Sequence, residues 1–193
     1  MRTQIIAAVA AAFTAAISSA ALADNAGVVE SVAETAYGTA PSQTKTEMHA
    51  GDPVVHRQLL ETSKAGGMKL KLADGSRLDL GADSKLLIVA YVYAPEQSIA
   101  NAVVSVPAGS VHYVTGAMPK GHTTIYTPTA TMVLNGTDIT VDVNERGNTH
   151  IAVDDGSITL RSRTTGQEMV YRAGQSVDIT PAGITTSTAE MTN

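Results

Sequence analysis

The chain has 193 residues, carries a formal charge of −5 and contains no cysteine. The absence of cysteine excludes disulfides, thiolate metal sites and a cysteine nucleophile. Nucleic acid is not an expected partner either, because binding to phosphates requires clustered Lys and Arg, and the 13 basic residues are scattered among 18 acidic ones. The length suits one domain with a single hydrophobic core.

Residues 1–23 have the features of a cleaved secretory signal peptide. A basic residue near the start precedes an alanine-rich apolar segment at 5–17, and a small-x-small pattern follows at 21–23. We expect cleavage between Ala23 and Asp24. The protein is therefore predicted to be exported, to the periplasm or out of the cell.

The strongest apolar run of the remaining chain spans residues 86–92. A run of this length is far too short to cross a bilayer as a helix. We therefore expect no stable membrane insertion after cleavage.

The first half of the remaining chain predicts short strands in succession. Residues 27–37 read as an opening strand, and 38–50 as an exposed loop. Residues 69–72 and 77–80 place Leu on one face and charge on the other. They flank an Asp-Gly pair, which suits a tight hairpin turn.

The apolar run at 85–93 predicts a central strand that is covered on both faces. We expect Tyr91 and Tyr93 to pack their rings there and to leave their hydroxyls at an edge.

The second half of the chain alternates apolar and polar residues between glycine turns, which recur about every 8 to 12 residues. This period of two places the apolar members on a common inner face. The residues that we expect in the core are Ile139, Val141, Val143, Ile151, Val153, Ile158, Leu160, Val177 and Ile179.

These patterns predict an all-β protein of many short antiparallel strands, arranged as a β-sandwich of jelly-roll-like form. A rolled or solenoid-like arrangement is the alternative, because the same strand patterns serve both. The single domain is expected to span residues 24–180, and residues 181–193, rich in Thr and Ser, to form a flexible tail.

No catalytic, cofactor or metal site is predicted. The five histidines lack the paired spacings of helical or knuckle-type metal ligands, so we expect scattered surface imidazoles. They are His49, His56, His112, His122 and His150. There is no Gly-x-Ser-x-Gly elbow of a serine hydrolase, so we do not expect an enzyme.

An ordered series of segments resembles the FecR domain family. It begins with Gly51-Asp52-Pro53-Val54 and Ala73-Asp74-Gly75-Ser76-Arg77-Leu78, and continues with Tyr91-Val92-Tyr93, Gly109 to Gly116, Thr127 to Thr131, Gly136-Thr137-Asp138, Val153 to Ile158 and Ala173 to Val177. The resemblance implies an all-β, protein-binding regulatory module of the bacterial envelope, and it does not imply an enzyme. Proteins of this family typically relay the state of an outer-membrane receptor to a cytoplasmic sigma factor.

The chain departs from the family pattern in two ways. It lacks the cytoplasmic sigma-binding segment and, after cleavage, a membrane span, so we expect a stand-alone exported domain. The family often has Arg before its Gly-Thr pair, and this position is Asn135 here.

The segment from 127 to 138 is the candidate partner-binding edge. Its proposed contact residues are Thr127, Pro128, Asn135, Gly136, Thr137 and Asp138. Local turn chemistry explains the same residues, and we favour it: a proline that breaks an edge strand, an Asn-Gly hairpin turn, and two residues that cap backbone groups.

Three classes of function remain. The leading hypothesis is an exported regulator or adaptor that binds an envelope protein through a sheet edge or loop face. The second is a module that binds an unknown small ligand or glycan. The third is a structural protein that self-assembles through its strand edges.

Overall fold

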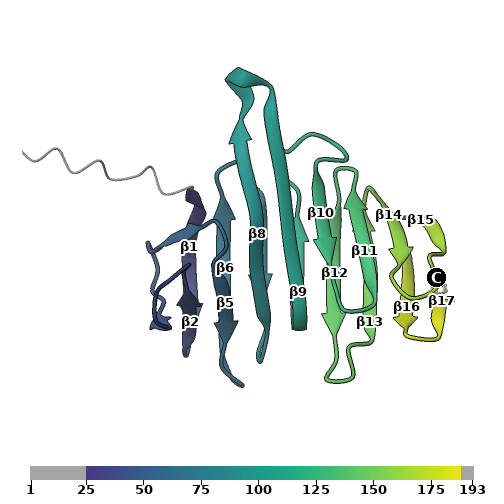
Figure 1. Ribbon diagram of the computed structural model, residues 1–193, viewed down its shortest axis with the longest axis horizontal. Coiled ribbons are helices and arrows are strands. Elements are labelled where there is room, and N and C mark those ends of the chain that lie inside the picture. The colour runs from purple at the N-terminus through teal and green to yellow at the C-terminus, as the bar shows by residue number, and fades with distance from the viewer. Residues whose placement is uncertain (1–24, 188–193) are drawn as a thin grey trace, which may run out of the picture.

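The structure, a computed structural model, describes residues 25–187 and is almost entirely β (Figure 1). The signal peptide predicted at 1–23, with its cleavage site at Ala23 and Asp24, lies outside the described residues. The strand pairings connect all strands into one network that does not close into a barrel. It is a mixed network, because β9 and β10 are parallel while the other pairs are antiparallel.

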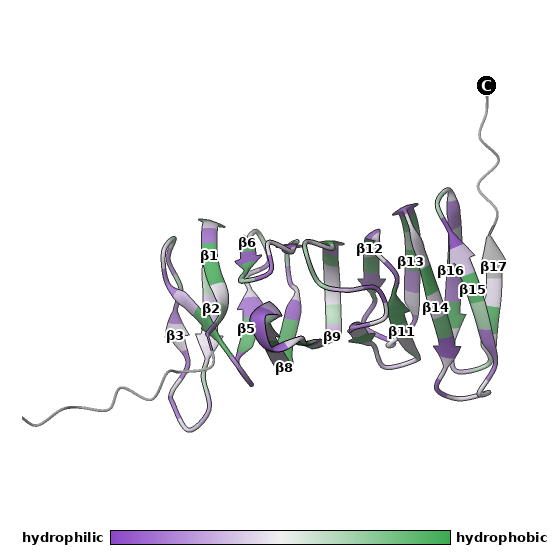
Figure 2. Cartoon of the chain, turned by 90° about the horizontal axis from the view of Figure 1, so that it is seen from above, coloured by the Kyte–Doolittle hydropathy of each residue, from purple (hydrophilic) through white to green (hydrophobic). Residues whose placement is uncertain are grey.

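The network folds into two facing layers (Figure 2). Layer A contains, in spatial order, β4 (Pro53–Val55), β1 (Asn25–Ala33), β6 (Gly67–Leu72), β7 (Arg77–Leu80), the second part of β9 (Ile99–Val114), β12 (Asp138–Val143), β13 (Thr149–Asp155), β16 (Gln175–Thr180) and β17 (Gly183–Ser187). Layer B contains β3 (Thr46–Glu47), β2 (Ala36–Thr39), β5 (Leu59–Thr62), β8 (Lys85–Ala94), the first part of β9, β10 (Thr123–Tyr126), β11 (Ala130–Leu134), β14 (Ser157–Ser162) and β15 (Glu168–Arg172).

The long strand β9 joins the layers. Its first part pairs with β8 and β10, and its second part, from Gly109, pairs with β7 and β12. Gly109 has a φ of 88°, and a side chain there would overlap Ser84. The Ser84 hydroxyl accepts the Ser110 N–H at 2.9 Å. Glycine is therefore required where β9 passes from one layer to the other.

Beyond β9 the chain alternates between the layers. The β10–β11 and β14–β15 hairpins lie in layer B, whereas the β12–β13 and β16–β17 hairpins lie in layer A. Each hairpin pairs with the previous one in its own layer, so the sandwich lengthens along one axis. The predicted all-β sandwich is confirmed. It shares one feature with the solenoid-like alternative, because successive hairpins are added along one direction.

The core lies between the layers, where the inward side chains of both meet. All the residues predicted for it from period-two alternation in the second half of the chain are buried. The predicted hairpin is formed by β6 and β7. The predicted central strand is β8, which pairs with β9 along its whole length. The expectation that both its faces are covered is wrong, because its outer face is only partly buried and Val92 is 40% exposed.

Three segments differ from the sequence expectation. The opening strand is divided into β1 and β2 at Glu34, which has a φ of 55°. The expected loop at 38–50 contains β3 and the buried side chain of Met48. The expected flexible tail contains β17, which pairs with β16 and packs Ile184 against the core.

The short helix η1 (Pro95–Gln97) closes the β8–β9 hairpin. No helix within residues 25–187 is long and apolar enough to span a membrane.

Candidate functional site

The outer face of layer A carries histidine and aspartate side chains on neighbouring strands. His112 of β9 lies opposite Asp79 of β7. Two residues further along the strands, His150 of β13 lies opposite Asp142 of β12 and Asp178 of β16. Side chains two residues apart on a strand share a face. We call this surface the histidine–aspartate face, and it comprises His112, His150, Asp79, Asp138, Asp142, Asp154 and Asp178.

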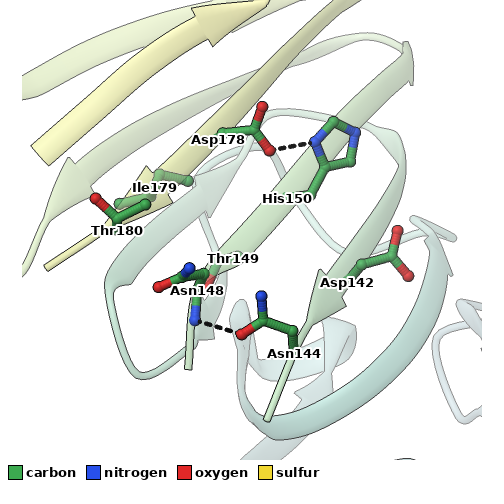
Figure 3. Close-up of a pocket in the computed structure, with 8 residues that line it drawn as sticks. All are labelled: Asp142, Asn144, Asn148, Thr149, His150, Asp178, Ile179 and Thr180. Carbon is green, nitrogen blue, oxygen red and sulfur yellow. Dashed lines mark hydrogen bonds and ion pairs between the residues drawn. The ribbon is translucent and has the colours of Figure 1, made fainter. Parts of the chain in front are cut away.

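One pair on this face lies beside an open hollow (Figure 3). Nδ1 of His150 is 2.7 Å from Oδ1 of Asp178, and both side chains are about half exposed. Asp142 lies on the other side of His150. Asn144 accepts the Asn148 N–H at 3.1 Å and closes the turn at the end of the hollow. The arrangement places an imidazole between two carboxylates at a solvent-accessible surface.

A second group lies on β9, β12 and β13. Nε2 of His112 is 2.6 Å from Oδ1 of Asp138. A register shift between β12 and β13 follows Asp138, and Asp154 lies opposite this irregularity. One nitrogen or oxygen atom from each of His112, Asp138 and Asp154 lies within 4.8 Å of the other two. Imidazole and carboxylate groups in such proximity are ligands of divalent metal ions.

The charges on the face are unevenly compensated. Lys69 forms an ion pair with Asp79 at 2.7 Å, and this hydrogen bond raises the pKa of Lys69. Within residues 25–187, neither Asp138 nor Asp154 forms an ion pair with Lys or Arg. Asp142 and Asp178 beside His150 likewise form no ion pair with Lys or Arg among these residues, so carboxylates without a basic partner lie beside both histidines.

Neither group was predicted from the sequence. His112 and His150 are partly exposed, as expected for surface imidazoles, but each is paired with an aspartate 26 or 28 residues away. Such pairs depend on which strands become neighbours and in which register, and local spacing carries no information about either. The alternation that placed His112 and Asp138 on outward positions was the only available signal.

Beneath the surface, the Asp-Gly-Ser turn anchors a buried polar network. Asp74 accepts hydrogen bonds from the Tyr91 hydroxyl at 2.8 Å, the Ser76 hydroxyl at 2.5 Å and the Met118 N–H at 3.1 Å. The Ser76 hydroxyl accepts the Gly116 N–H at 2.8 Å. This network ties the β6–β7 turn to β8 and to the segment after β9. Asp74, Ser76, Tyr91 and Gly116 belong to the segments that carried the FecR resemblance.

The expectation that the Tyr91 hydroxyl lies at an edge is wrong. It is enclosed with Asp74, and burial together with the hydrogen bond to Asp74 raises the pKa of Tyr91. Burial also raises the pKa of Tyr113. Tyr113 Oη and Thr123 Oγ1 are buried without a hydrogen-bond partner in the described part of the chain.

The candidate edge at 127–138 does not form one continuous edge. Thr127 and Thr137 lie at opposite ends of β11, and this strand is paired on both sides, with β10 and β14. Both threonines are buried. The Thr127 hydroxyl accepts the Ala130 N–H at 3.0 Å, and the Thr137 hydroxyl donates to the Ser157 carbonyl at 2.9 Å. Both are thus occupied with backbone groups.

The other members of the segment are more accessible. Pro128 is exposed, and Asn135 and Gly136 are partly buried. The Asn135-Gly136 turn carries the chain from layer B to layer A, so it is not the hairpin turn that the sequence suggested. Of the six proposed contact residues, Asp138 belongs to the histidine–aspartate face. A role of the segment in partner binding stays a prediction.

Solved structures share this fold. Two structures of a protein from Parabacteroides distasonis, described as a "putative anti-sigma factor" and determined at 2.50 and 1.65 Å, each match with a TM-score of 0.54 and 13% sequence identity. Each match covers 67% of this chain and 59% of the other, so this chain spans about three fifths of those structures. At this identity the likeness concerns the fold alone. No curated protein matches the chain.

The family described as FecR protein matches residues 58–159, which is more than half of the 193 residues. The matched segment contains the Asp74 network, the β8–β9 hairpin and the His112 group. The resemblance inferred from the sequence is thereby confirmed, and the chain belongs to the FecR protein family.

Proposed function

We propose that this chain is a non-enzymatic regulatory module that is exported to the bacterial envelope and acts by binding another envelope protein. The observation that carries the proposal is the family match over residues 58–159. Membership of the FecR family supports a role in regulatory signalling. The signal peptide predicted at 1–23 supports export, and the described surface supports protein binding.

The β8–β9 hairpin is the surface best suited to a partner. It projects beyond the ends of the neighbouring strands (Figure 1). β8 pairs with β5 only over Lys85–Leu87, whereas its pairing with β9 continues to Ala94. Arg57 and Gln58 continue to hydrogen-bond to the backbone of Ile88, and His56 contacts the Tyr91 N–H. Only the tip of β8, beyond Tyr91, therefore has a strand on one side only within the described residues. An open strand edge of this kind can receive an extended segment of a partner by strand addition.

Exposed apolar side chains lie on the same hairpin. Val92 is 40% exposed and Ile99 is 48% exposed. Val92 lies opposite Asn101, and Ile99 lies opposite Ala94, so both side chains point to the same face of the hairpin. Apolar side chains beside an open backbone edge give a partner both hydrogen bonds and a contact that excludes water.

In-cell cross-linking of the tagged protein, followed by affinity purification and mass spectrometry, tests the proposal. A tagged, exported protein of unrelated fold is the control. We expect one envelope protein to be enriched over this control. Enrichment of the chain alone would contradict the proposal and favour self-assembly, for which the edge strands β15 and β17 are available.

A further inference from the structure

We propose that His112, Asp138 and Asp154 form a binding site for a divalent transition-metal ion, with zinc as the expected occupant. The site is independent of the partner-binding role proposed above. Three adjacent strands of layer A, β9, β12 and β13, supply one ligand each. The ligand atoms already lie within 4.8 Å of one another.

The donor set favours zinc over calcium or magnesium. An imidazole nitrogen is a good ligand for zinc, nickel and copper, whereas calcium and magnesium prefer sites made of oxygen atoms alone. His112 supplies nitrogen, and Asp138 and Asp154 supply carboxylate oxygens. Three protein ligands leave one tetrahedral position for water or for a group of a second molecule.

The electrostatic environment is also favourable. Asp138 and Asp154 bring two carboxylates together without an ion pair to Lys or Arg among residues 25–187. By contrast, Lys69 neutralises the nearby Asp79. A divalent cation would balance the two carboxylates, which otherwise repel each other as like-charged neighbours on adjacent strands.

Binding requires only side-chain adjustment. Nε2 of His112 and Oδ1 of Asp138 are 2.6 Å apart, a distance at which they share a proton. Ligands at about 2.0–2.2 Å from a tetrahedral zinc ion lie about 3.3–3.5 Å from each other. The ion would thus replace the shared proton and separate these two atoms slightly. The side chain of Asp154, which is exposed, would turn toward the ion.

Solvent can reach the His112 imidazole from the side of β7. A shallow hollow lined in part by Asp79, Ser110 and His112 opens beside the imidazole. Asp138 and Asp154 do not line this hollow, so water molecules that complete the coordination would reach the ion beside Asp154, which is exposed. A bound ion would connect the second part of β9 with the β12–β13 hairpin, that is, the strand that joins the layers with the following half of the sandwich.

Isothermal titration of the purified protein with zinc chloride tests the site, with cobalt chloride and visible absorption as a second readout. The variants are His112→Ala and Asp154→Asn. The matched control is His150→Ala, which removes the other aspartate-paired imidazole of the same face. Although Asp142 and Asp178 flank His150, these three side chains do not bring their ligand atoms within 4.8 Å of one another as the His112 group does.

We expect one zinc ion per chain, and at least tenfold weaker binding in His112→Ala and Asp154→Asn. His150→Ala should bind zinc like the unaltered protein, and a large excess of magnesium should not displace the ion. Circular dichroism shows whether each variant is folded. Equal affinities of His112→Ala, His150→Ala and the unaltered protein would overturn the proposal, as would the absence of measurable zinc binding.

Discussion

Tyr91 and Asp74 satisfy each other's polar groups inside the sandwich. The Tyr91 hydroxyl donates to Oδ1 of Asp74 and accepts the Asp74 backbone N–H, both at 2.8 Å. A buried carboxylate is costly unless hydrogen bonds compensate it. This reciprocal contact fixes the β6–β7 turn on β8. It gives a physical reason why the Asp-Gly-Ser turn and the strand that contains Tyr91 both belong to the segments that resemble the family.

Removal of the Tyr91 hydroxyl should destabilise the fold. Tyr91→Phe leaves the buried Asp74 carboxylate and N–H with one partner fewer each, so the free energy of unfolding should fall by about 2–3 kcal/mol. Urea denaturation measures the change. Tyr113→Phe is the matched control, because Tyr113 is also buried but its hydroxyl, near Ser76 and Thr123, makes no hydrogen bond of regular geometry in the described structure. The control should be neutral or slightly stabilising; equal losses in both variants would contradict this interpretation.

The turn at Gly156 should not tolerate alanine. Gly156 has a φ of 75°, and a Cβ there would overlap the carbonyl oxygen of Gly136. Gly166 has a φ of 71° but open space around it. We expect Gly156→Ala to cost more than about 3 kcal/mol, and Gly166→Ala about 1 kcal/mol, which is the backbone strain alone. Thermal denaturation of both variants distinguishes crowding from strain, and similar losses would argue against the close approach of the two turns.

Glu61 should contribute to the acid sensitivity of the fold. Hydrogen bonds from Lys45 at 2.7 Å and Lys85 at 3.3 Å lower the pKa of Glu61 despite its partial burial. A carboxyl group with a lower pKa in the folded state stabilises that state above the unfolded pKa, about 4.3, and loses this contribution as the pH falls through the folded value.

Glu61→Gln should therefore reduce stability by up to about 1 kcal/mol at pH 7 and by less at pH 3. Denaturation midpoints measured across this range give the difference. Glu96→Gln, at an exposed position in η1, is the control and should show no such dependence. A constant difference between Glu61→Gln and the unaltered protein at all pH values would contradict the ion-pair explanation.

Charges on the β8–β9 hairpin should impair partner binding. Val92→Asp and Ile99→Asp place a carboxylate on the exposed apolar face and should reduce recovery of the cross-linked partner at least tenfold, because an unpaired buried charge costs more than 1.4 kcal/mol. Val170→Asp is the matched control: Val170 is 47% exposed on the edge strand β15, far along the sandwich. Equal recovery with Val92→Asp and Val170→Asp would exclude the hairpin as the contact surface.

The sequence was sufficient where local patterns determine structure. Alternation in β12, β13, β14 and β16 identified the core, and the Asp74-Gly75 turn identified the β6–β7 hairpin. The sequence was insufficient where contacts between distant segments determine the structure. The passage of β9 between layers depends on the fit of Gly109 against Ser84, and the pairing of His112 with Asp138 depends on strand register. Neither relation leaves a periodic signal.

The most direct test of the proposed function is photo-cross-linking in living cells with a photoreactive amino acid at position 92. The same residue at position 170 serves as the control. The account predicts a cross-link from position 92 to one envelope protein, which is absent or much weaker from position 170. The same products from both positions, or none from position 92 in an exported and folded protein, would contradict it.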